Sequence, residues 1–364
     1  MLGSRGIPAS YSGVETAVEH LAAGFVERGH DVTVYCRSHA VEHRDEHVGA
    51  SLVHLPALQN KYLDTLSHTA VSTGHLVRAE RPDVALYAIS GNAPVLPVAR
   101  LAGVPSVLQI DGLDSLRAKW PKAARLYLRA TERLSPLAAT VAVTDSEVVA
   151  RDYERRFGRR LLSIPYGASL EDPGDLGRCA ELGIEPGQFV LFVGRLVPEN
   201  NAHLLVAAHM SLETGWPLVV VGDGRYADRY VDELHAAGDE RVRFPGAIYG
   251  PGYGELVHRA GLVCVPTEVG GTHPVIVEAM AAGAPLLVSD HEPNLEVVGD
   301  AAAVFPLGGG WSALARQLGE LIDDDARRAS LGVRAKARAT ARYSWDRCVE
   351  QYLAVFRAVI ERSA

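Results

Sequence analysis

The chain has 364 residues, of which 48% are hydrophobic and 22% charged, and its formal net charge at pH 7 is −8. A chain of this length predicts two domains with substantial cores. The acidic balance argues against nucleic acid as a partner, because phosphate backbones attract basic surfaces. No apolar run reaches the roughly 18 residues that a membrane span needs. The four scattered cysteines show no paired spacing, which favours a reducing cytoplasm and no structural metal.

Short apolar runs alternate with longer amphipathic segments along the chain. The runs expected to form strands are 31–35, 84–87, 106–110, 140–143, 189–193, 217–221, 262–265 and 285–288. Helices expected between and after them include 15–28 and 324–342. This alternation is typical of parallel sheets with crossover helices, so the expected fold class is α/β.

The strand pattern occurs twice, which predicts two doubly wound, Rossmann-like domains. The expected bounds are 1–170 for the first domain and 171–342 for the second. The last segment, 343–364, carries an apolar stripe at helical spacing, and we expect this helix to cross back onto the first domain.

A glycine loop at 3–8 stands almost at the start of the sequence. Only Met1 and Leu2 precede it, whereas a strand usually has about five or six residues. We expect the native chain to begin before Met1, with a strand stub as the alternative.

Gly194 and Arg195 follow the apolar run 189–193. A glycine at a strand end lets a ligand approach the backbone. An arginine beside it can make bidentate bonds to a diphosphate. The alternative is a surface arginine at an ordinary turn.

A second signal follows the run that ends at Val265. Gly270, Gly271 and Thr272 are expected to open a helix whose free N–H groups form an anion site, with simple turn chemistry as the alternative. Glu278 lies further along that helix, where a carboxylate can accept both hydroxyls of a ribose. Its alternative is a solvated helix glutamate.

Several segments together resemble the retaining glycosyltransferases of family 4. The matching segments are 13–16, 28–32, 193–199, 221–224, 278–285 and 343–346. The resemblance implies the GT-B fold, in which two Rossmann-like domains face a central cleft. It also implies a nucleotide-diphosphate sugar as co-substrate, no cofactor and no metal.

A narrower set of segments resembles the rhamnosyltransferase-like branch of that family. They are 5–8, 91–94, 111–113, 117–120, 165–168, 198–201 and 270–274. This likeness suggests dTDP-rhamnose or a similar deoxysugar as donor, while a UDP- or GDP-sugar stays open.

Three positions depart from the family pattern. Asn200 and Asn201 stand where a lysine usually helps to hold the diphosphate. Gly270 stands where the family has a glutamate eight residues before Glu278, and Asp111 stands near the place of a cleft-facing histidine. The first two departures leave fewer charges for holding the donor sugar.

The resemblance implies a role for each matching residue. Arg195, Asp111 and Glu278 are the expected catalytic residues, with Arg195 stabilising the leaving diphosphate and Asp111 orienting a sugar or acceptor hydroxyl. The expected donor-binding residues are Gly194, Arg195, Gly246, Gly270, Gly271, Thr272, His273 and Glu278. The expected cleft and acceptor-side residues are Gly6, Gly13, Glu15, Asn92 and Asp111.

The acceptor could be a glycan, a lipid-linked glycan or a small molecule. Segment 117–133 interleaves basic and apolar residues, which predicts weak peripheral contact with the inner membrane face or, alternatively, a solvated helix face. Two other functions stay open: a nucleotide-sugar epimerase on the same fold and a non-catalytic subunit that binds a sugar nucleotide.

Overall fold

The computed structural model describes residues 1–9, 13–60, 63–79, 81–116, 120–224 and 228–362. The chain divides into two compact units. Unit 1 comprises 1–167 together with 345–364, and unit 2 comprises 168–344. These bounds differ by a few residues from the expected domain limits at 170 and 342.

Unit 2 is built on one parallel six-stranded sheet. Its strands are β8 (Val190–Val193), β9 (Leu218–Val221), β10 (Val242–Gly246), β11 (Leu262–Val265), β12 (Leu286–Ser289) and β13 (Ala303–Phe305). The strand order is β10-β9-β8-β11-β12-β13, so the chain winds outward from the middle in both directions. This is the doubly wound order of a Rossmann-like fold.

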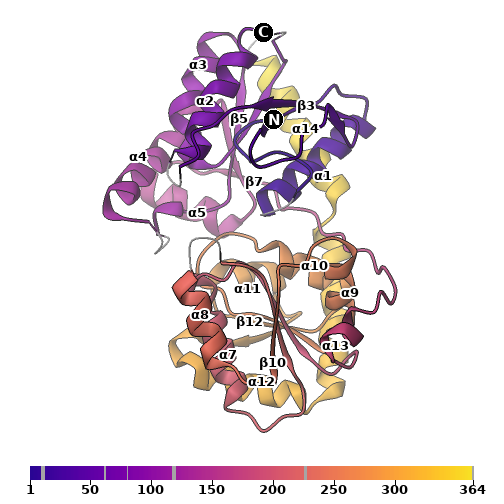
Figure 1. Ribbon diagram of the computed structural model, residues 1–364. Coiled ribbons are helices and arrows are strands. Elements are labelled where there is room, and N and C mark those ends of the chain that lie inside the picture. The colour runs from indigo at the N-terminus through magenta and orange to yellow at the C-terminus, as the bar shows by residue number, and fades with distance from the viewer. Residues whose placement is uncertain (10–12, 61–62, 80, 117–119, 225–227, 363–364) are drawn as a thin grey trace. The chain divides into compact units, whose positions relative to one another are not determined.

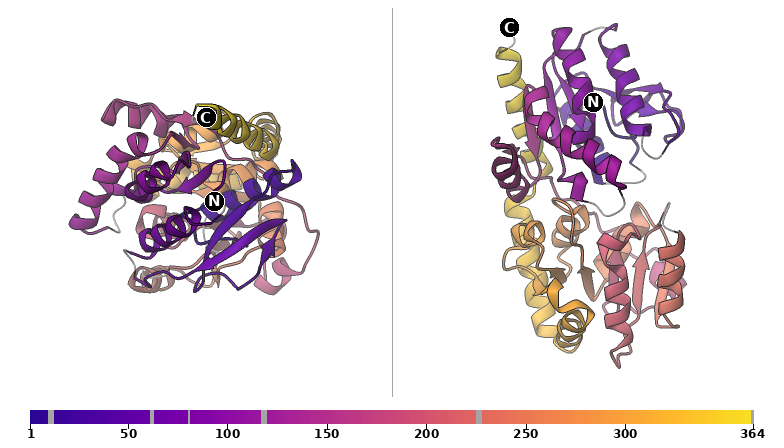
Figure 2. Two further views of the ribbon diagram at one scale, coloured as in Figure 1. Left: turned by 90° about the horizontal axis from the view of Figure 1, so that it is seen from above. Right: turned by 90° about the vertical axis from the view of Figure 1, so that its left-hand side faces the viewer.

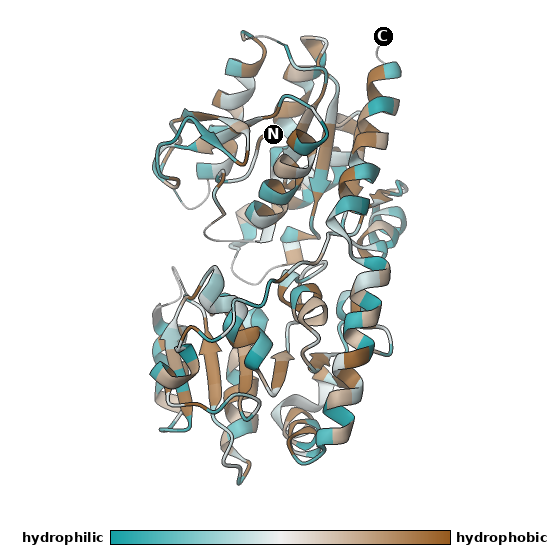
Figure 3. Cartoon of the chain, turned by 90° about the vertical axis from the view of Figure 1, so that its right-hand side faces the viewer, coloured by the Kyte–Doolittle hydropathy of each residue, from teal (hydrophilic) through white to brown (hydrophobic). Residues whose placement is uncertain are grey.

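Helices cover both faces of this sheet (Figures 1 and 2). They are α6 (Arg178–Leu182), α7 (Ala202–Met210), α8 (Asp228–Ala237), α9 (Pro251–Arg259), α10 (Pro274–Ala282), α11 (Glu292–Val298), α12 (Gly310–Ile322) and α13 (Asp325–Arg342), with 3₁₀ turns η3 (Pro198–Asn200) and η4 (Leu307–Gly309). Consecutive residues of a strand point to opposite faces of the sheet. Val190 and Phe192 belong to the hydrophobic core on one face, and Leu191 belongs to the core on the other. Strands buried on both faces become continuous apolar runs, visible as brown strands in Figure 3.

The strands that the described residues of unit 1 form are β1 (Thr33–Arg37), β2 (Glu46–His47), β3 (Ala50–Leu55), β4 (Ala85–Ala88), β5 (Ser106–Ile110), β6 (Val141–Thr144) and β7 (Leu162–Ser163). Its helices are α1 (Gly13–Glu27), α2 (Asp64–Leu76), α3 (Leu96–Leu101), α4 (Lys122–Ala138), α5 (Glu147–Phe157) and α14 (Trp345–Glu361), with 3₁₀ turns η1 (Ser90–Val95) and η2 (Asp114–Leu116).

Met1 and Leu2 join the two sheets of unit 1. The Tyr35 amide donates to the Met1 carbonyl at 3.0 Å, and the Leu2 amide donates to the Leu86 carbonyl at 2.8 Å. These residues therefore act as a short parallel strand between β1 and β4, and Leu2 pairs with Tyr87. With this stub counted, unit 1 has the same doubly wound order as unit 2.

The C-terminal helix α14 packs against α1 within unit 1, as the yellow and indigo helices in Figure 1 show. Gly24 makes this approach possible, because a Cβ built there would lie 2.5 Å from Val349. Gly167 is just as confined, with a built Cβ 2.4 Å from the Trp345 backbone nitrogen. The apolar stripe read from the sequence is thus buried against the first domain.

His68 on α2 predicts how the stability of unit 1 depends on pH. Its side chain is fully buried, and burial, reinforced by the nearby Arg37 charge, lowers its pKa from 6.5 to about 4. Between pH 6.5 and pH 4, His68 therefore binds a proton more readily in the unfolded chain than in the folded one. The free energy of unfolding falls as the pH drops through this range. At about 1.4 kcal/mol per unit, this residue should remove roughly 2 kcal/mol of unfolding free energy between pH 7 and pH 5.

Urea unfolding at pH 7 and pH 5 measures this effect. The His68→Gln variant should lose less unfolding free energy between the two pH values than the wild type does. Equal losses in the two proteins would contradict the assignment to His68.

Candidate active site

Two loops meet at the carboxyl end of the unit 2 sheet. Gly194 and Arg195 follow β8, and residues 266–273 follow β11, the adjacent strand where the winding direction reverses. Ligands of open α/β sheets bind at such a reversal, outside the carboxyl ends of the strands. The Glu268 amide donates to the Glu199 carbonyl at 3.2 Å and so links the two loops.

Asn200 and Asn201 brace these loops. The Asn200 side-chain amide donates to the Arg195 carbonyl at 2.8 Å, which fixes the backbone that carries the guanidinium. The Asn201 amide donates to the Pro266 carbonyl at 3.0 Å and ties the first loop to the end of β11. Both side chains are buried. In the region where the resemblance leads us to expect a lysine, two buried asparagine side chains therefore hold the loops in place.

The expectation that Gly270, Gly271 and Thr272 open a helix was wrong. Helix α10 begins at Pro274, with His273 as its N-cap residue. Gly270 has a φ of +132°, which no helix can include, and proline is favoured in the first helical turn. The glycines and Thr272 therefore form a loop in front of the helix.

The N-cap residue of α11 and a side chain within that helix hold this loop. His291 lies 3.1 Å from the Gly270 carbonyl through its Nε2 atom. The Asn294 amide donates to Thr267 Oγ1 at 3.2 Å and to Ser289 Oγ at 2.9 Å. His291 and Asn294 were not among the expected site residues, because they stand outside any glycine-rich or charged motif.

Glu278 lies on α10 and accepts a hydrogen bond of 2.5 Å from the Tyr253 hydroxyl of α9. Burial raises the pKa of the Glu278 carboxyl, and the bond from Tyr253 partly offsets that effect. Glu278 is therefore a half-buried, oriented carboxyl group, and the alternative of a solvated helix glutamate does not hold. Tyr253 likewise was not among the expected site residues.

Gly246 ends β10 with a φ of +81° and is exposed. Its carbonyl accepts from the Gly222 amide at 3.0 Å. Gly222 in turn lies against the Arg195 loop, since a Cβ built on it would come 1.9 Å from the Gly194 carbonyl oxygen. The segment 221–224 thus packs its backbone against the backbone of Gly194 and supports the loop that carries Arg195.

Gly6 and Asn92 of unit 1 have packing roles. Gly6 has a φ of +116°, and a Cβ built there would lie 2.5 Å from Cys36 Sγ. Asn92 is fully buried and donates to the Ala88 carbonyl at 2.8 Å. Both residues lie near the carboxyl ends of the strand stub and β4. Their contacts hold the backbone there in place.

Gly13 is the first residue of α1, and Glu15 lies buried in its first turn. A Glu15 carboxylate oxygen lies 4.0 Å from Arg5 Nε. Glu15 thus stands in the first turn of α1, where a carboxylate complements the helix dipole, and it also lies close to Arg5.

Asp111 directly follows β5 and is half-buried. Its Oδ1 atom accepts from the Tyr166 hydroxyl at 2.6 Å and from the Gln109 amide at 3.2 Å.

Each unit matches one family of known proteins. Residues 12–167 match the family described as Glycosyl transferase 4-like domain. Residues 180–338 match the family described as Glycosyl transferases group 1. The two matches together cover most of the chain.

The chain is also similar to individual relatives. It is 29% identical over 332 residues to the phosphatidyl-myo-inositol mannosyltransferase of Mycobacterium leprae, covering 76% of this chain and 86% of that protein. The D-inositol 3-phosphate glycosyltransferase of Nocardia farcinica is 33% identical over 217 residues, covering 55% of this chain and 48% of that protein.

Solved structures share the fold over the whole chain. Sucrose-phosphate synthase from Thermosynechococcus elongatus has a TM-score of 0.82 at 19% identity and covers 100% of this chain and 98% of its own. Anabaena HepE in complex with UDP-glucose has a TM-score of 0.76 at 18% identity, covering 97% of this chain and 98% of its own. The expected GT-B fold is confirmed.

Proposed function

We propose that this chain moves a sugar from a nucleotide-diphosphate sugar to an acceptor hydroxyl with retention at the anomeric carbon, because residues 180–338 match the group 1 glycosyl transferases and residues 12–167 match the glycosyl transferase 4-like domain. The acceptor is a glycan, a lipid-linked glycan or a small molecule. The observation that carries the proposal is the pair of linked loops at the reversal point of the unit 2 sheet, one of which carries Arg195 and the other the glycine-rich turn.

The proposed chemistry needs a stabilised leaving group and a well-placed acceptor. Arg195 and backbone N–H groups of the 270–272 loop stabilise the charge that develops on the departing diphosphate. Glu278 accepts hydrogen bonds from the ribose hydroxyls. The acceptor attacks from the face that the diphosphate leaves, and a phosphate oxygen takes the proton, so no protein nucleophile is required.

The proposed donor is dTDP-rhamnose, a UDP-sugar or a GDP-sugar. The narrower resemblance favours dTDP-rhamnose, the structural relative HepE was solved with UDP-glucose, and one sequence relative is a mannosyltransferase. The exposed loop around Gly246 is the proposed reader of the base, and His273 the proposed contact with the sugar.

A thermal-shift screen of dTDP-rhamnose, UDP-sugars and GDP-sugars tests donor binding, since a ligand that binds only the folded state raises the melting temperature. Sugar transfer from the best donor to a panel of lipid-linked and soluble acceptors then tests the reaction. Absence of any shift with all three donor classes would overturn the proposal.

The comparisons do not favour the epimerase alternative. Incubation with donor alone separates the two enzymes, because an epimerase would produce a new free nucleotide sugar without an acceptor. A binding-only subunit would raise its melting temperature with a donor and yet transfer no sugar to any acceptor.

We also propose that α4 contacts anionic lipid. Leu126 and Leu137 are 70% and 52% exposed, and Lys122, Arg129 and Arg133 are exposed on the same helix. Exposed leucines among basic side chains suit a negatively charged bilayer surface. Arg117 and Lys119 of the segment lie outside the described residues. No helix within the described residues is long and apolar enough to cross a bilayer.

Co-sedimentation with liposomes at low salt should show binding to vesicles that contain phosphatidylglycerol and little to neutral vesicles. The Arg129→Gln/Arg133→Gln variant should bind several-fold less. The matched Arg316→Gln/Lys336→Gln variant, which removes two exposed charges from unit 2, should bind like the wild type. Equal binding by both variants would contradict a role for α4.

A further inference from the structure

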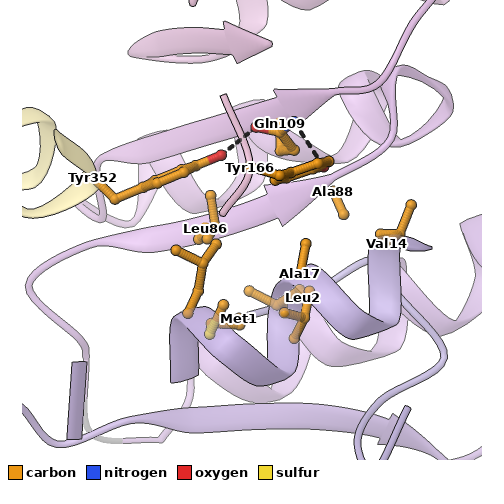
Figure 4. A pocket seen from close by; sticks show the side chains of 11 residues that line it. Met1, Leu2, Val14, Ala17, Leu86, Ala88, Gln109, Tyr166 and Tyr352 are labelled. Atoms are coloured by element: carbon orange, nitrogen blue, oxygen red, sulfur yellow. Dashed lines mark hydrogen bonds between the residues drawn. The ribbon is translucent and has the colours of Figure 1, made fainter. Parts of the chain in front are cut away.

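A chain of hydrogen-bonded side chains in unit 1 leads from α14 to Asp111. The Tyr352 hydroxyl of α14 donates to the Oε1 atom of Gln109 on β5. The Gln109 amide donates to the Tyr166 hydroxyl at 3.0 Å and to Asp111 Oδ1 at 3.2 Å. Tyr166 then donates to the same Asp111 oxygen at 2.6 Å. Figure 4 shows Tyr352, Gln109 and Tyr166 side by side.

The bonds in this chain all run in one direction. An ionised carboxylate can only accept, so Tyr166 and Gln109 must donate to Asp111. Gln109 can turn its NH₂ group towards Asp111 and Tyr166 only if its oxygen faces the other way, where Tyr352 supplies a hydroxyl proton. Tyr352 therefore selects the orientation of the Gln109 amide.

The tyrosines stay protonated at any physiological pH. Burial raises the pKa of Tyr166 well above its usual range, and the neighbouring Asp111 charge raises it further. Burial likewise raises the pKa of Tyr352. Both hydroxyls remain donors, so the polarity of the chain does not reverse.

The three donor residues of the chain lie in largely apolar surroundings. Gln109, Tyr166 and Tyr352 are all buried, and they line a small cavity whose other walls are apolar side chains of α1, β4 and the strand stub (Figure 4). In such low-dielectric surroundings each hydrogen bond is stronger, and each lost partner costs more, than in water.

We propose that Tyr166, Gln109 and Tyr352 are positioning residues that hold Asp111 as an oriented hydrogen-bond acceptor for a substrate hydroxyl. The inference rests on the proposed function for its substrate, an acceptor whose hydroxyl donates to Asp111. It assigns a role in the unit 1 site to α14, the last helix of the chain.

Tyr166→Phe and Tyr352→Phe test the inference, with Tyr87→Phe as the matched control. Tyr87 is a fully buried tyrosine of the same sheet whose hydroxyl lies 3.0 Å from Thr73 Oγ1, away from Asp111. Tyr166→Phe should lower kcat/KM for the acceptor roughly tenfold or more, because a hydrogen bond to a charged group is lost. The acidic limb of its pH profile should move to higher pH, and the thermal shift produced by the donor should stay unchanged.

Tyr352→Phe should change the same quantities in the same direction by a smaller factor. Tyr87→Phe should destabilise the fold like the other two variants but leave the pH profile in place. A Tyr166→Phe enzyme with an unshifted profile and a kcat/KM within twofold of the wild type would overturn the inference.

A readout that needs no turnover separates this inference from the proposed function. In ¹³C NMR of labelled aspartate, with Asp111→Asn to assign the signal, the titration midpoint of Asp111 should move to higher pH in Tyr166→Phe. If the wild type transfers no sugar but this midpoint moves, the function fails and the positioning of Asp111 stands. If the midpoint stays, the positioning fails whatever the activity.

Discussion

Arg195→Ala should lower kcat/KM for sugar transfer by roughly 10²–10³-fold, because it removes the guanidinium that we propose stabilises the charge developing on the diphosphate. The backbone at this position is well held. The Arg195 carbonyl accepts from the Asn200 side chain at 2.8 Å and from the Val197 amide at 2.9 Å. Truncation of the side chain should therefore leave the loop in place and remove only the guanidinium.

Steady-state kinetics with the donor found by the thermal-shift screen measures this effect. Arg195→Lys should recover part of the lost rate, since an ammonium retains the charge without the bidentate geometry. Arg338→Ala is a suitable control, because Arg338 is also half-buried and donates to backbone carbonyls, but it lies on α13. An Arg195→Ala enzyme with more than a third of the wild-type kcat/KM would mean that another group holds the diphosphate.

Much of the fold could be predicted from the sequence because parallel strands buried on both faces are continuous apolar runs. The eight expected strands are all present. The strands that were missed break this pattern. β10 contains Arg243 and Pro245, β13 has only three residues, and β3 includes a serine and a histidine. A strand at or near a sheet edge tolerates such residues, so its sequence carries a weaker signal.

The candidate site was less predictable, because its positions depend on partners distant in sequence. Glu278 could be found from its place after a glycine-rich loop, but Tyr253, 25 residues earlier, belongs to no motif. The bond between Tyr352 and Gln109 spans 243 residues and depends on how α14 packs. The start of α10 was misplaced because glycines signal a turn without showing which residue first adopts helical angles.

Gly222→Ala should destabilise unit 2 by about 3 kcal/mol and lower its melting temperature by roughly 10 °C. Gly222 has a φ of +154°, which is strained for any other residue. A Cβ at this position would lie 1.9 Å from the Gly194 carbonyl oxygen, and a backbone atom cannot move away cheaply. The Leu196 amide also donates to the Asp223 carbonyl at 2.7 Å, so the two loops must shift together.

The displacement should reach the donor site as well, since Gly194 directly precedes Arg195. We therefore expect Gly222→Ala to weaken donor binding in addition to lowering stability, with both read from melting curves at increasing donor concentration. Gly215→Ala is the matched control: a Cβ built at Gly215 meets nothing within 4 Å, so this variant should melt and bind like the wild type. If Gly222→Ala lost stability but bound the donor normally, the 221–224 loop would support the fold of unit 2 without positioning Arg195.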